Sequence, residues 1–114
     1  MNKFELFTMI FYALDLYYEN NPSDELGIFL GAMSPFTFKE IDSADSAIYE
    51  EFCEIVNKES IEIEESYDLA KDYLKSIENI DVYSFFCEVT TKKQWVEGCK
   101  EYLESEHKGS RLSE

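Results

Sequence analysis

Histidine is almost absent from this 114-residue chain, which contains only His107. Catalysis by a Ser-His-Asp or Cys-His arrangement needs a histidine held against its nucleophile. His107 follows the last apolar stretch, so we expect it to be exposed and not held in this way. Glu104 and His107 have the spacing of one ligand pair of a di-iron bundle, but such a site needs a second pair and two further carboxylates. We therefore expect no catalytic triad and no metal site, and the sequence indicates no cofactor.

Nucleotide and metal motifs are also missing. The sequence contains no GxGxxG, P-loop or HExxH motif, and Asp42–Asp45 lacks the further ligands and the glycine of a calcium loop. Among the many acids, Asp15 is the best candidate for acid–base catalysis because it lies within an apolar stretch. A hydrogen bond to a tyrosine or a helix N-terminus is the simpler explanation of Asp15, so we predict that the chain is not an enzyme.

Cysteine is scarce, and the three residues form no CxxC pair. Cys53, Cys87 and Cys99 all have apolar neighbours, and an odd number of thiols does not suit a disulfide framework. We expect three reduced, buried thiols that react slowly in the folded state, as in a cytoplasmic protein.

Basic residues are few: ten stand against twenty-five acids, which gives a formal net charge of −15. Such a charge opposes binding to nucleic acid backbones and to anionic membranes. The longest apolar run is interrupted by Asp15, is too short to span a bilayer and has no signal-peptide cleavage site after it. We expect a cytoplasmic monomer or weak dimer that contacts neither nucleic acid nor membrane directly.

Apolar and aromatic residues, by contrast, are abundant enough for a sizeable core. The richest stretch is Leu6–Tyr18, in which only Thr8 and Asp15 are polar. A helix that is apolar on nearly every side is a buried helix, so the other segments should surround it. The predicted fold is all-α: a compact five- to six-helix orthogonal or irregular bundle around a buried N-terminal helix.

Capping residues and apolar spacing mark the remaining helices. Predicted helix starts lie at Asn2, Ser23, Asp42–Asp45, Ser60 and Thr91. Inward positions on the second and third helices are Leu26, Phe29, Leu30, Met33, Ile48, Phe52, Ile55 and Val56. Gly27 and Gly31 indicate close helix packing, and Phe36–Phe38 is expected to be extended and to close one end of the core.

The segment Asp81–Thr90 is ambiguous. Tyr83, Phe85, Cys87 and Val89 alternate as in a half-buried strand, but Asp81 is a good N-cap and no second strand is available to pair the backbone. A helix is therefore favoured. The domain should span residues 1–104, and we expect residues 105–114 to form a disordered polar tail.

The acids are concentrated in residues 39–80, where thirteen acids and four lysines give a net charge of −9. Such a charge is typical of a solvated surface that keeps a protein soluble. It also suits a docking surface for a basic protein, because the field accelerates encounter. The predicted partner-binding residues are seven acids and two aromatics: Glu50, Glu54, Glu62, Glu64, Glu65, Asp68, Asp72, Tyr49 and Tyr67.

In size, acidity and lack of catalytic motifs, the chain resembles bacterial immunity proteins that neutralise basic nuclease toxins. The resemblance implies a non-catalytic binding protein of bacterial type with a basic toxin as its partner, and it assigns no role to any residue. A nucleic-acid mimic or an adaptor is the alternative within the binding class. A small enzyme that uses Asp15 is the alternative from a different class.

Overall fold

The computed structural model describes residues 1–35 and 45–104. This part of the chain forms six α-helices and no strand: α1 (Lys3–Asn20), α2 (Asp24–Met33), α3 (Ser46–Ile55), α4 (Ile63–Lys75), α5 (Val82–Val89) and α6 (Lys92–Glu104). The all-α prediction is confirmed, and so is the helix in the ambiguous segment. The expectations for Phe36–Phe38, for Asp42–Ala44 and for the tail with His107 lie outside the described residues.

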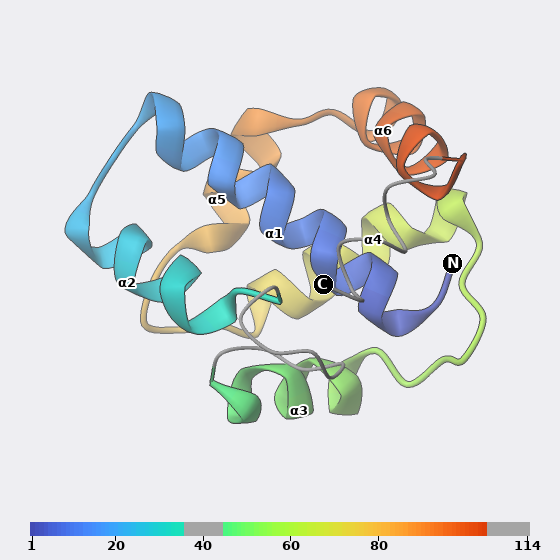
Figure 1. The fold of residues 1–114 in the computed structure, drawn as a ribbon, viewed down its shortest axis with the longest axis horizontal. Helices are drawn as coiled ribbons and strands as arrows, with labels where there is room; N and C mark the ends of the chain where they lie inside the picture. Colours follow the sequence, from blue (N-terminus) through green and yellow to red (C-terminus); the bar gives the residue numbers. More distant parts are fainter. Residues whose placement is uncertain (36–44, 105–114) are drawn as a thin grey trace.

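Helix α1 runs through the middle of the molecule (Figure 1). It contacts α2, α3, α4 and α5, while α6 packs on α4. Its start is a capping box: the Asn2 side chain accepts from the Glu5 amide at 2.8 Å, and the Glu5 carboxylate accepts from the Asn2 amide at 2.9 Å. The helices around α1 cover the face that carries Phe4, Leu6, Phe7, Ile10 and Leu14, all of which are buried.

Short side-chain caps begin the outer helices, as expected. Ser23 accepts from the Leu26 amide at 3.2 Å, Asp45 from the Ala47 amide at 3.1 Å and Asp81 from the Ser84 amide at 3.3 Å. Helix α4 is the exception, because it begins at Ile63 instead of near Ser60 and its N-cap residue, Glu62, makes no side-chain capping bond.

Aromatic side chains join the helices in the core. Phe7 of α1 packs edge-on against Phe52 of α3, with ring centroids 5.0 Å apart, and Phe52 packs edge-on against Tyr73 of α4 at 4.9 Å. Phe86 of α5 and Trp95 of α6 make a similar contact at 5.2 Å. All five rings are buried, and such pairs add about 0.5–1.5 kcal/mol each beyond the area that they bury.

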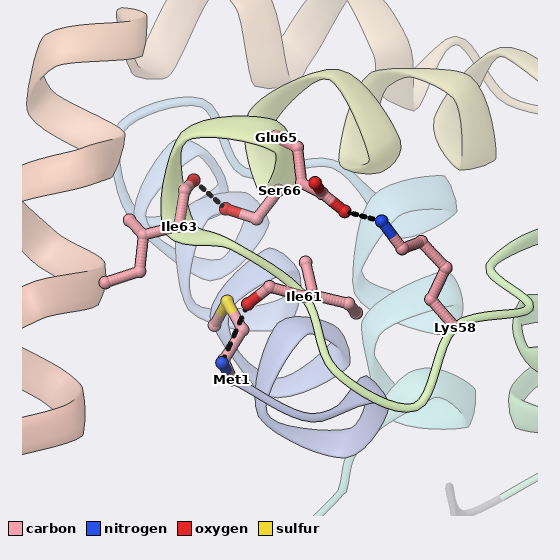
Figure 2. A network of polar contacts seen from close by, with 6 residues as sticks. All are labelled: Met1, Lys58, Ile61, Ile63, Glu65 and Ser66. Carbon is pink, nitrogen blue, oxygen red and sulfur yellow. Dashed lines mark hydrogen bonds and ion pairs between the residues drawn. The ribbon is translucent and has the colours of Figure 1, made fainter.

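A buried hydrogen bond fixes α6 on α4. The Trp95 indole N–H donates to the Ser66 hydroxyl at 2.8 Å, and that hydroxyl donates to the Ile63 carbonyl at 2.5 Å. Figure 2 shows this first turn of α4 together with the segment before it, where Met1 and Ile61 exchange two backbone bonds of 2.8 Å. The polar groups that this junction buries therefore have partners, as buried polar groups need.

Close packing explains one of the two glycines on α2. A Cβ on Gly27 would lie 3.1 Å from the Tyr18 hydroxyl oxygen, so the end of α1 approaches α2 more closely than alanine permits without a shift of Tyr18. Gly31 is exposed, and a Cβ there would meet nothing within 4 Å. The prediction of close packing is therefore confirmed at Gly27 and wrong at Gly31.

Three apolar residues are more exposed to solvent than the sequence pattern predicts. Leu16 on α1 is 50% exposed and Ile55 on α3 is 42% exposed, while Phe11 is only half-buried. Leu16 lines a hollow between α1 and α6, which leaves this side of α1 partly open. Ile55 precedes the buried Val56 by one residue, or about 100° around the helix, and so falls on the rim of α3.

The three cysteines differ in burial, whereas the sequence predicts that all three are buried. Cys99 is buried, Cys53 is half-buried and Cys87 is exposed. The prediction of three buried thiols is wrong for Cys87, because α5 turns Phe86 into the core and the next residue therefore points outward. Burial raises the pKa of Cys99 to about 12, with the Ser66 hydroxyl and the Met1 amino group opposing the shift.

We expect Phe7→Ala to lower the free energy of unfolding by about 3–5 kcal/mol, because it empties the contact between α1 and α3. Leu16→Ala, on the same helix but half exposed, should cost far less. Urea denaturation followed by circular dichroism measures both. Equal losses in the two variants would contradict the placement of Phe7 at the centre of the core.

We also expect one of the three thiols to react rapidly in the folded protein. Labelling with a chromogenic disulfide reagent should modify Cys87 first and Cys99 only on unfolding, because the thiolate is the reactive form and Cys99 is buried with a raised pKa. Cys87→Ser should remove the fast phase. If the fast phase survives in that variant, the exposure of Cys87 is wrong.

Candidate functional site

The predicted acids on α4 form a row on its outer side. Ser66, Ala70 and Leu74 are buried, whereas Glu64, Asp68 and Asp72 are exposed. The three acids are spaced four residues apart, so they lie on one face with a rise of about 6 Å between neighbours.

Helix α3 carries a second, shorter row. Glu50 and Glu54 are both exposed and also four residues apart. Each lies about 160° around the helix from the buried Phe52, so the pair points away from the core. Because α3 contacts α4, the two rows lie on the outer sides of neighbouring helices, and the loop between these helices adds the exposed Glu62.

Few of these charges are neutralised within the described part of the chain. Glu65 forms an ion pair with Lys58 (Figure 2). The other six predicted acids, Glu50, Glu54, Glu62, Glu64, Asp68 and Asp72, form no ion pair between residues 1–35 and 45–104.

The nearby lysines contact aromatic rings instead. Lys71 lies 5.1 Å from the ring centre of Tyr67, and Lys75 lies 4.9 Å from that of Tyr83. Such cation–π contacts hold the ammonium groups to the sides of α4. The outer row of α4 therefore keeps a net negative charge.

The two predicted aromatic anchors are mainly core residues. Both are half-buried: Tyr49 packs on Phe7 at 5.1 Å, and Tyr67 packs on Phe86 at 5.7 Å. Their rings stabilise the fold, and each side chain is only partly accessible to a binding partner.

Asp15 is half-buried on α1. It is not among the residues that line the neighbouring hollow between α1 and α6, whose lining is mostly apolar. Among the residues that the structure describes, no group of three or more His, Cys, Asp or Glu side chains is arranged to hold a metal ion. No helix in those residues has the length and apolarity needed to cross a membrane.

The sequence reasoning missed Glu51 and Tyr73. Burial raises the pKa of Tyr73, and the Glu51 carboxylate adds to the shift, so the two side chains are electrostatic neighbours. Tyr73 follows Ala70 by three residues and precedes Ile77 by four, a spacing that already indicates an inward position. Glu51 carries no such signal, because only the packing of α3 on α4 brings it to Tyr73.

The acid row should cost stability that a mutation can recover. Each like-charged pair four residues apart destabilises a helix by about 0.2–0.5 kcal/mol, and Asp68 belongs to two such pairs. We expect Asp68→Asn to raise the free energy of unfolding by about 0.5 kcal/mol in low salt and by less in 1 M NaCl, measured by urea denaturation.

Glu97→Gln is the matched control, because Glu97 is exposed on α6 and its one like-charged neighbour four residues away, Glu101, is balanced by Lys93 and Lys100 one turn away. This change should give no gain. A similar gain from both variants would show that the repulsion is not specific to the acid row.

No family model, curated protein or solved structure matches this chain, so the functional argument rests on the described residues alone. Their most distinctive chemical feature is the set of exposed, unpaired carboxylates on α3 and α4.

Proposed function

We propose that this chain is a binding protein whose acidic helices α3 and α4 engage a basic protein. The observation that carries the proposal is the exposure of six acids on these helices and the loop between them, none of which has an ion-pair partner in the described part of the chain. Carboxylates that repel one another in the free protein gain most from a partner that supplies lysine or arginine.

The finer part of the proposal concerns the partner, which we propose to be a toxin of the nuclease type. A nuclease binds nucleic acid through a basic surface that tracks phosphates. An acidic helical surface is complementary to that surface and would cover it. The chain would then act as an immunity protein, by occupying the surface that the toxin needs for its substrate.

Charge would act chiefly on the rate of association. Exposed acids at the rim of an interface steer the encounter and add little to the final affinity. The Debye length falls from about 10 Å at 0.1 M salt to about 3 Å at 1 M, so salt should remove most of the steering.

The test begins with capture of partners on the immobilised chain at low and at high salt. A basic protein recovered at low salt would then be measured for its association rate by surface plasmon resonance. The triple variant Glu64→Lys, Asp68→Lys and Asp72→Lys should slow association by at least about tenfold. It leaves Glu65 in place, so the ion pair with Lys58 is kept.

A second triple variant controls for total charge. Glu97→Lys, Glu101→Lys and Glu104→Lys change the net charge by the same amount on α6, and this variant should slow association far less. Equal effects of the two triple variants, or the recovery of no basic protein, would contradict the proposal. Circular dichroism of both variants separates lost binding from lost folding.

The toxin assignment has its own readout. A recovered partner that degrades nucleic acid should be inhibited by the chain at a molar ratio near one, and less well by the α4 variant. A basic partner without nuclease activity would support docking and contradict the toxin assignment.

A further inference from the structure

Two adjoining hollows are lined by residues of α2, of α3 and of the C-terminal end of α4 with the segment that follows it. Their volumes are about 420 and 270 Å³, and both are lined by Phe29, Ile48 and Asn79. Because they share these residues the two hollows adjoin, and together we call them the groove; Tyr73 lines only the larger hollow and Ile28 only the smaller one.

The groove has an apolar floor. Phe29, Ile48 and Ile77 are half-buried and line it. In the smaller hollow, Ile28 is 75% exposed. The floor could therefore cover the aliphatic part of a bound side chain.

The polar lining is acidic. Glu51 and Glu78 line the larger hollow and Glu25 lines the smaller one, and no lysine or arginine is among the described residues that line either hollow. None of the three acids forms an ion pair with any of the residues described. The nearest lysine in sequence, Lys75, lies over the Tyr83 ring.

Tyr73 adds a hydrogen-bond acceptor. Its side chain is only 2% exposed and lines the larger hollow. No hydrogen bond joins its hydroxyl to the described residues 1–35 and 45–104, and this oxygen is not among their fully buried atoms without a partner, so it remains accessible from the hollow. The oxygen can accept a bond from a donor that enters the groove.

We infer that this groove seats an arginine side chain of the basic partner. A guanidinium group has five N–H donors in a planar fork and no acceptor. The groove offers the matching set: carboxylates from Glu51 and Glu78 and the Tyr73 hydroxyl oxygen. The methylene stem of the arginine packs on Ile48 and Ile77, and the guanidinium plane stacks on Phe29.

Lysine suits the groove less well. Its ammonium is a compact, strongly hydrated charge, which cannot form paired bonds to two carboxylates in one plane and does not stack on a ring as a guanidinium does. The inference rests on the proposed function for the presence of a basic partner, and it adds the side chain that anchors this partner.

The test uses small probes in place of the partner. Nα-acetylarginine amide is titrated into ¹⁵N-labelled protein and followed by amide chemical shifts. Nα-acetylcitrulline amide, which has nearly the same shape without the charge, and Nα-acetyllysine amide are titrated in parallel. The arginine probe should shift amides of residues 48–51 and 73–79, the lysine probe should bind at least about fivefold more weakly, and the citrulline probe should not bind.

Two variants locate the effect. Glu51→Gln with Glu78→Gln should weaken the arginine probe at least about tenfold, and Tyr73→Phe should weaken it severalfold while leaving the fold intact. Glu97→Gln with Glu101→Gln, which removes the same charge from α6, should leave it unchanged. Shifts spread evenly over the acids of α3 and α4, equal binding of lysine, or full binding by the Glu51 and Glu78 variant would overturn the inference.

The outcomes separate this inference from the proposed function. If the arginine probe binds in the groove but no basic protein is captured, the arginine site stands and the proposed function fails. If a basic protein is captured and the Glu51 and Glu78 variant binds it with unchanged affinity, the arginine site is overturned and the proposed function stands.

Discussion

The contact of Phe52 with Phe7 on one side and Tyr73 on the other is the interaction on which the rest of the structure depends. It joins α1, α3 and α4 through buried rings about 5 Å apart. The same contact sets where the two acidic helices lie relative to each other. Tyr73 also lines the groove at the end of α4, so the core and the candidate arginine site share a residue.

Core burial allows the chain to keep an acidic surface. Burying one large apolar side chain contributes about 1.5–3 kcal/mol, whereas a like-charged pair on a helix surface costs only a few tenths. The nineteen buried hydrophobic residues in the described part of the chain therefore offset the repulsion among the exposed acids. The exposed carboxylates on α3 and α4 therefore cost the fold little stability, and a basic partner of the kind proposed would relieve their repulsion.

Most of the helices could be predicted because their signals are local. Caps at Asn2, Ser23 and Asp81 and the apolar face of α4 depend on neighbours within one or two turns. The predictions that Cys87, Leu16 and Ile55 are buried are wrong for one shared reason. Apolar composition says that a residue favours burial, but only the positions of the surrounding helices decide which side of each helix is covered.

The sequence by itself determined the helical class, the buried first helix and the acidic character of residues 39–80, since periodicity and net charge require no long-range information. Tertiary structure alone decided that Glu65 is paired with Lys58 while Glu64 and Asp68 are not, and that Glu25, Glu51 and Glu78 line one groove. Residues from α2, α3 and the end of α4 are far apart in the chain. They come together only because the rings of α1, α3 and α4 pack in one arrangement.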